Sequence, residues 1–203
     1  MPEVPPTSDT AKPSLNARVS AVALVVGTVA LLALATQKYS LAPLRLLTMA
    51  VLAFGAWAFC DEMGMRKPLI RAGFVAFTFA TFARASAVVD IHSESLGRFY
   101  LLYAFGLMVA MLLWSVAYLH RQRELKVAGA LGALVSITPI VALVVGHIAL
   151  GAGAALGIGS LLAATEGAEL KDLSAITTVD AVFGLWAVVT AWFLWRGHIR
   201  GSA

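Results

Sequence analysis

The chain has 203 residues, of which 60% are hydrophobic and 13% are charged, and its mean hydropathy is +0.86. Soluble domains carry roughly 25% charged residues, so this composition excludes a soluble protein and indicates an integral membrane protein. The formal net charge of +4 does not point to nucleic acid, because the basic residues stand at the ends of apolar runs, where membrane topology accounts for them. We therefore expect membrane lipid, and no nucleic acid, as a partner.

The apolar runs predict helices. The strands of a membrane barrel would show segments of about ten residues with alternating polarity, and no segment of this chain does. The expected fold is an all-α, polytopic transmembrane helix bundle.

The N-terminal segment 1–16, MPEVPPTSDTAKPSLN, is rich in Pro, Ser and Thr, which is typical of a disordered tail. Residues 17–200 are expected to form a single transmembrane domain. Within its first apolar run, Ala33-Leu34-Ala35 resembles the cleavage site of a signal peptide. The segment before that run is long and contains two acids and four prolines, unlike a signal peptide, so we expect an uncleaved anchor.

A helix needs about 20 apolar residues to cross the hydrocarbon core of a membrane. Between the fourth and the last clear run, the apolar stretch 127–165 is too long for one crossing and slightly short for two. The clear runs are 19–36, 42–60, 70–89, 99–119 and 177–195.

Charge asymmetry predicts the orientation. The segments 61–71 and 120–126 each carry three or more cations, whereas the alternate loops 37–40 and 90–98 carry one each. Cytoplasmic loops of membrane proteins are enriched in Lys and Arg, so the N-terminus is expected in the cytoplasm. Arg196 and Arg200 place the C-terminus there as well, which requires an even number of spans.

An even number is reached if 127–149 forms one span. The following segment, 150–165, is rich in glycine and is expected to remain on the outer side as a re-entrant or surface helix. The prediction is six spans, with both termini in the cytoplasm of a bacterium and the bundle in its inner membrane. The alternative is seven spans with the C-terminus outside.

Aromatic residues gather near the expected span ends. An interfacial belt of Trp and Tyr would explain this, and so would core packing. Near the cytoplasmic ends lie Trp57, Trp114, Tyr118, Trp192 and Trp195, and near the outer ends lie Tyr39, Tyr100 and Tyr103.

Three charged residues, Arg45, Arg84 and Asp180, fall inside expected spans. Each stands five or six residues from the outer end of its span, about 9 Å or less at 1.5 Å per residue. All three therefore share the outer third of the membrane. Three other polar side chains share that level, namely His147, Tyr100 and Tyr103.

Helical geometry gives a direction to two of these charges. Arg84 falls on the small-residue side of its helix, opposite Val75, Phe79 and Phe82. Asp180 is likewise in line with small residues, and small residues mark contacts between helices in membranes. The sequence thus predicts a buried Arg84–Asp180 ion pair.

The simpler alternative for an arginine near a span end is that it reaches the lipid headgroups along its own stem. Arg45 has no clean face, and for it this alternative is favoured. Asp180 is too short to do the same and needs a partner. For His147 the simpler alternative is an ordinary packed histidine.

The functional hypothesis is an outer-facing polar pocket whose excess positive charge suits an anionic ligand, such as a carboxylate, a phosphate or a lipid headgroup. This favours a small transporter or channel-like protein, alone, as a homo-oligomer or within a larger membrane complex. One alternative is a non-catalytic accessory or assembly subunit of a larger membrane complex, and a second is a membrane enzyme acting on lipid. The ligand-binding candidates are Arg84, Asp180, Arg45, His147, Tyr100 and Tyr103.

Catalytic, metal and cofactor sites are not expected. The single cysteine, Cys60, excludes a CxxC motif, and the four histidines follow no known ligand spacing. No nucleophile stands near a base in a recognisable pattern. An enzyme is therefore the less favoured class.

Overall fold

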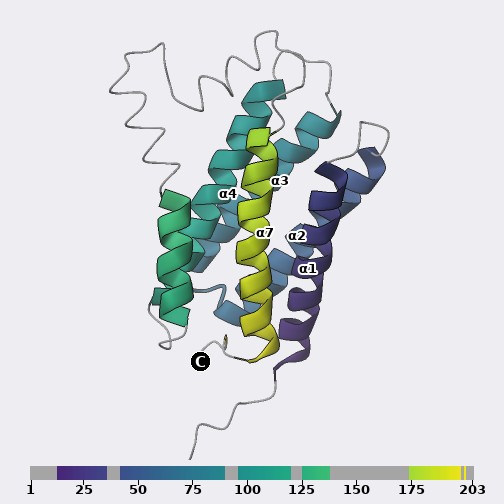
Figure 1. Cartoon of the computed structure of the whole chain (residues 1–203). Coiled ribbons are helices and arrows are strands. Elements are labelled where there is room, and N and C mark those ends of the chain that lie inside the picture. The colour runs from purple at the N-terminus through teal and green to yellow at the C-terminus, as the bar shows by residue number, and fades with distance from the viewer. Residues whose placement is uncertain are drawn as a thin grey trace, which may run out of the picture.

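The structure is a computed structural model that describes residues 13–35, 42–89, 96–119, 125–137 and 174–197, together with Ile199 (Figure 1). Every regular element within these ranges is a helix, which confirms the all-α expectation for the described part of the chain. The helices are α1 (Leu15–Ala35), α2 (Ala42–Met63), α3 (Pro68–Val89), α4 (Leu96–Leu119), a shorter helix Leu125–Ile137, and α7 (Ser174–Trp195).

Among the described residues, three helices are long and apolar enough to cross a membrane, and they span Leu15–Leu34, Ala42–Met63 and Leu102–Leu119. The protein therefore has the helices of a membrane protein. α3 is as long as α2 but contains two arginines. Residues 138–149 of the expected span 127–149 and all of the glycine-rich segment 150–165 lie outside the described residues.

Local sequence explains where the helices begin and end. α1 starts four residues before the expected span, because the Ser14 hydroxyl caps it by accepting a hydrogen bond from the Ala17 amide at 2.9 Å. The turn after α2 contains Gly64, whose φ of 94° favours glycine. α3 then begins on Pro68, whose ring suits the first helical position.

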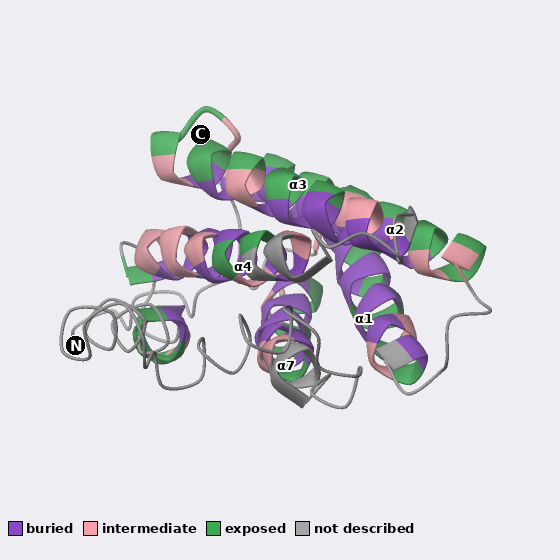
Figure 2. Cartoon of the chain, turned by 90° about the horizontal axis from the view of Figure 1, so that it is seen from above, coloured by how far each residue is buried: buried purple, intermediate pink, exposed green. Residues whose placement is uncertain are grey.

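The helices form a closed ring. α1 packs on α2 and α7, α3 packs on α2 and α4, and α4 meets α7. Seen from above, α7 lies between α1 and α4, with α2 and α3 across from it (Figure 2). The close approach of α3 and α4 requires Gly106, where a Cβ would meet the Ala76 carbonyl oxygen.

Two contacts fix the direction of α1 relative to its neighbours. The Ser14 hydroxyl donates to Glu62 Oε2 at 2.7 Å, which brings the end of α2 to the start of α1. The Arg18 guanidinium carbon lies 5.9 Å from the centre of the Trp195 ring, which brings the end of α7 there too. α1 is consequently antiparallel to both α2 and α7.

An aromatic cluster fills the half of the bundle nearer this end. The rings of Trp114 and Trp186 stack with centroids 5.4 Å apart and planes at 19°. Phe59 meets the Trp114 ring edge-on at 5.2 Å and 79°. The members of the cluster are Phe59, Phe77, Trp114, Tyr118, Phe183 and Trp186.

For Trp114 and Tyr118, the structure decides between an interfacial belt and core packing. Trp114 and Tyr118 are buried, and their polar atoms reach partners inside the bundle: Trp114 Nε1 donates to the Ile70 carbonyl at 3.3 Å and the Tyr118 hydroxyl to Thr190 at 3.2 Å. Buried Tyr and Trp side chains need such partners. These two residues therefore belong to the packed core of the bundle and not to a belt at the membrane interface. Trp57, Trp192 and Trp195 are about half exposed, as a belt requires.

The face of α3 that is exposed on the surface of the bundle is the one that the sequence predicts. Val75, Phe79 and Phe82 are exposed, and Phe82 reaches 71%. Gly73, Ala80 and Ala87, on the opposite side, are buried. The prediction that the small-residue side of α3 faces the neighbouring helices is therefore confirmed.

We expect Phe59→Ala to destabilise the protein strongly, since Phe59 is fully buried against three aromatic rings. The loss of these contacts should lower the free energy of unfolding by roughly 3–5 kcal/mol. Phe54→Ala is the matched control on the same helix, because Phe54 is half exposed. Thermal unfolding in detergent measures both, and equal losses would show that the cluster is not the core.

Candidate functional site

An ion pair inside the bundle is the centre of the candidate site. Arg84 Nη2 on α3 lies 3.3 Å from Asp180 Oδ2 on α7. Asp180 is completely buried and the Arg84 side chain is 9% exposed. The Arg84–Asp180 pair predicted from the sequence is confirmed, and Arg84 does not extend outward on its own.

Two tyrosines of α4 complete the surroundings of the pair. The Tyr103 hydroxyl donates to Asp180 Oδ1 at 2.5 Å, so each carboxylate oxygen has its own donor. The Arg84 guanidinium carbon lies 4.9 Å from the centre of the Tyr100 ring and 5.0 Å from that of Tyr103. These ring faces attract the cation and shield it from lipid.

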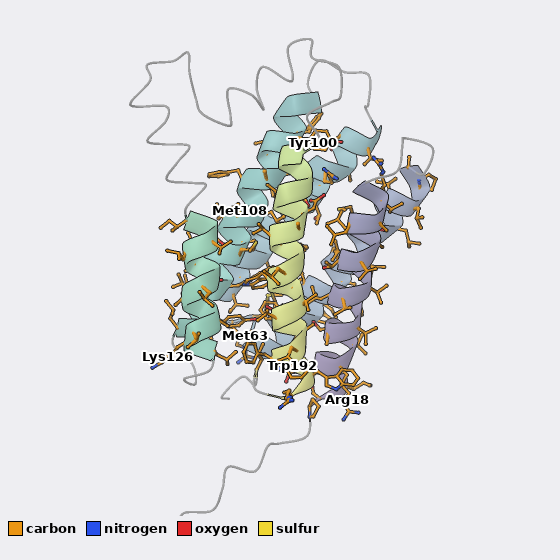
Figure 3. The ribbon with its side chains drawn as sticks, viewed as in Figure 1. Arg18, Met63, Tyr100, Met108, Lys126 and Trp192 are labelled. Atoms are coloured by element: carbon orange, nitrogen blue, oxygen red, sulfur yellow. The ribbon has the colours of Figure 1, made fainter. Side chains whose placement is uncertain are left out.

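The positions of these groups follow from helical spacing. Tyr100 and Tyr103 are three residues apart and so lie on one face of α4. That face meets the small-residue side of α3, where Ala80 and Ala87 leave room for large neighbours. The cluster lies at the end of the bundle opposite Arg18, Lys126 and Trp192, as the position of Tyr100 shows (Figure 3).

One polar atom of the pair remains without a partner. Arg84 Nη1 is buried and makes no hydrogen bond, whereas Nη2 is bound to Asp180. An unpaired buried donor is costly, by about 1–3 kcal/mol or more for a charged group. Such an atom is a place where a ligand or a water molecule gains a hydrogen bond.

A small cavity lies beside Arg84, between α1, α2 and α3. Its volume is about 10 Å³, close to the space that one water molecule needs. Two of its walls are cationic side chains, Arg84 and Arg45. The remaining walls are Leu31, Leu34, Thr48, Met49 and Val88.

Arg45 has a definite partner as well as a place on this cavity. Its Nη2 donates to the carbonyl oxygen of Leu34 at 3.1 Å, in the last turn of α1. The carbonyl end of a helix attracts a cation, so this bond stabilises the end of α1. This bond could not be predicted from the sequence, because its acceptor is a backbone oxygen on another helix.

The six candidate residues fall into three groups in the structure. Arg84, Asp180, Tyr100 and Tyr103 form one connected cluster, and Arg45 lines the same small cavity as Arg84. His147 lies outside the described residues. The cavity that Arg84 and Arg45 line is too small for a carboxylate or a phosphate.

The site offers donors and positive charge, and the described residues hold no group of three His, Cys, Asp or Glu side chains that would bind a metal ion. The four histidines all lie outside those residues.

No protein-family model, curated protein or solved structure matches the chain significantly. Two guanidinium groups and one carboxylate suit a small anion better than a cation.

We expect Arg84 and Asp180 to behave as one unit in a double-mutant cycle. Arg84→Gln and Asp180→Asn should each lower the free energy of unfolding by roughly 3–5 kcal/mol, because each leaves a lone buried charge. The double variant should cost no more than either single one. Unfolding in detergent measures the cycle, with the exposed Arg71→Gln on the same helix as a control, and additive losses would contradict the pairing.

The two tyrosines should respond differently to loss of their hydroxyl groups. Tyr103→Phe removes a hydrogen bond to a buried carboxylate and should cost about 1.5–3 kcal/mol of stability. Tyr100→Phe keeps the ring face that Arg84 contacts and should be close to neutral. The same unfolding assay decides, and equal effects would mean that Asp180 does not depend on Tyr103.

Proposed function

We propose that the protein is a small polytopic transporter or channel-like protein of the bacterial inner membrane that binds a small anion between Arg84 and Arg45. The observation that carries this proposal is the buried, unpartnered Nη1 of Arg84, on a residue that lines the same cavity as a second arginine. Asp180 neutralises Arg84, and Arg45 brings a second guanidinium group to the same cavity. An anion there would accept hydrogen bonds from both arginines.

The proposed topology is six spans with both termini in the cytoplasm. It is supported by the antiparallel arrangement of α1 and α7, because two antiparallel spans at the ends of a domain require an even number of crossings. The basic residues Arg18 and Lys126 lie at one end of the bundle (Figure 3), which the positive-inside rule assigns to the cytoplasm. The Arg84 cluster then belongs to the outer half.

The size of the cavity limits the ligand in this conformation. A volume of about 10 Å³ suits a water molecule, and a monatomic anion needs only a slight expansion. A carboxylate, a phosphate or a lipid headgroup would require α1 and α2 to move away from α3. Movement of that kind is what alternating access to an occluded site demands.

A non-catalytic accessory or assembly subunit is the second candidate. The observation in its favour is that both oxygens of Asp180 are satisfied within the chain, so that the cluster serves equally as a bridge between α3, α4 and α7. In that case the cavity holds water only, and the protein acts through a partner or through a second copy of itself.

Anion binding and flux separate the two candidates. We expect chloride or nitrate, titrated against gluconate, to raise the thermal midpoint of the purified protein. Arg45→Gln should weaken this binding about tenfold or more, because it removes one charged donor from the cavity. Lys126→Gln, an exposed cation far from the cavity, should leave it unchanged.

The matching transport measurement is anion-dependent flux in proteoliposomes. Binding together with flux, both reduced in Arg45→Gln, supports the transporter. Binding that is absent, or equally affected by Lys126→Gln, overturns the anion site. A protein that shows neither binding nor flux and co-purifies with a membrane partner is an accessory subunit.

A further inference from the structure

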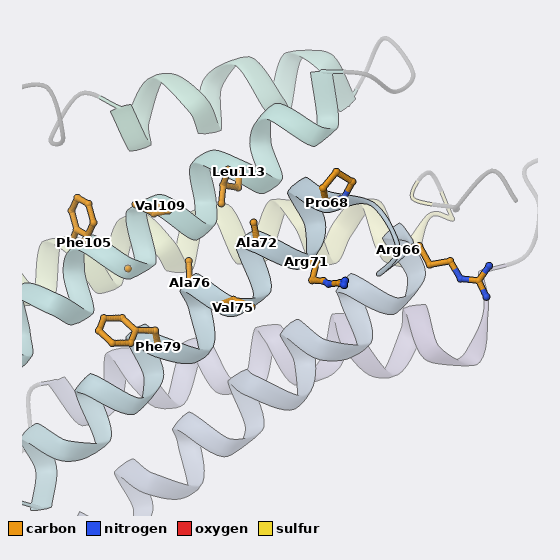
Figure 4. A pocket seen from close by; sticks show the side chains of 11 residues that line it. Arg66, Pro68, Arg71, Ala72, Val75, Ala76, Phe79, Phe105, Val109 and Leu113 are labelled. Atoms are coloured by element: carbon orange, nitrogen blue, oxygen red, sulfur yellow. The ribbon is translucent and has the colours of Figure 1, made fainter.

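A second site lies on the surface of the bundle, at the end opposite the Arg84 cluster. A groove of about 750 Å³ runs between α3 and α4. Arg66 and Arg71 stand at one end of it, and Phe79 and Phe105 flank the other (Figure 4). We propose that this groove binds one anionic phospholipid, with an acyl chain along the groove and the phosphate at the two arginines.

Like a phospholipid, the groove is charged at one end and apolar along the rest of its length. Its only charged walls are Arg66 and Arg71, and both side chains are exposed. Within the described part of the chain neither arginine forms an ion pair, so both are available to a headgroup. An arginine guanidinium matches a phosphate through two parallel hydrogen bonds.

The length of the groove fits one leaflet. α3 rises about 16 Å between Pro68 and Phe79, which is close to half of a hydrocarbon core of about 30 Å. Phe79 and Phe105 would then meet the end of the acyl chain near the middle of the membrane. The headgroup of a bound lipid would therefore lie at the arginine end of the groove, and the end of its acyl chain would lie at the phenylalanine end.

Small side chains leave the space that the acyl chain would fill. Ala72 and Ala76 lie between the arginines and the phenylalanines, on the stretch of α3 that faces α4 (Figure 4). Gly106 lets the two helices approach closely at the far end. The result is a hollow next to exposed Val75 and Phe79, on a surface already suited to lipid.

The leaflet follows from charge. Arg66 lies in the α2–α3 turn next to Lys67, and Arg71 lies in the first turn of α3. The cytoplasmic leaflet carries anionic lipids that attract such basic segments. The groove is thus placed to hold an anionic lipid where those lipids are concentrated, and it is independent of the anion cavity in the other half of the bundle.

Native mass spectrometry of the purified protein, with phosphatidylglycerol and phosphatidylcholine offered at equal amounts, tests the site. We expect the wild-type protein to retain phosphatidylglycerol with a preference of roughly tenfold or more. Arg66→Gln combined with Arg71→Gln should reduce that preference to nearly one. Lys67→Gln is the matched control, because Lys67 lies between the same residues but does not line the groove.

A second variant tests the apolar part of the groove. Ala72→Leu places a larger side chain in the hollow from an exposed position and should reduce retention of both lipids. A preference that survives the double arginine variant, or that Lys67→Gln lowers equally, overturns the proposal in favour of diffuse attraction. Cross-linking of Phe105→Cys to a second copy would overturn it too, since the groove would then be a protein interface.

Discussion

The structure depends on how a buried positive charge is neutralised. Arg84 is embedded among apolar helices, where a lone charge is unfavourable by several kcal/mol or more. Asp180 supplies the opposite charge from α7, and Tyr103 supplies the second donor that the carboxylate needs. Because the three residues come from α3, α4 and α7, one charge requirement fixes three helices relative to each other.

The two halves of the bundle are held together by different physics. One half contains the ion pair, its tyrosines and a cavity with a second arginine, whereas the other contains stacked aromatic rings with their polar atoms satisfied. The interior of the aromatic half is occupied by buried rings that stack or meet edge-on. The interior of the polar half retains an unpaired donor and a small cavity, which is where we propose that an anion binds.

Four arginines illustrate three solutions to charge in a membrane protein. Arg84 is paired with a carboxylate, and Arg45 binds the carbonyl end of α1. Arg66 and Arg71 stay exposed at the end of an apolar groove, where lipid phosphate is the natural partner. The first solution orders the fold, the second stabilises a helix end, and the third is directed outward to the bilayer.

The sequence by itself determined the helical membrane class, the positions of the described helices to within a few residues, and the side of α3 that faces inward. It also predicted the Arg84–Asp180 pair, because composition, apolar length and the spacing of small residues are local properties read along one helix.

Trp114 and Tyr118 show the limit of such reasoning, since a ring near a span end is compatible with both an interface and a core. Only the tertiary structure decided that Tyr103 binds Asp180, that Arg45 binds the carbonyl of Leu34, and that Arg84 and Arg45 share a cavity. Each of these depends on which helices are neighbours and at what rotation, and the apolar spans of a bundle are too alike in sequence to specify that order.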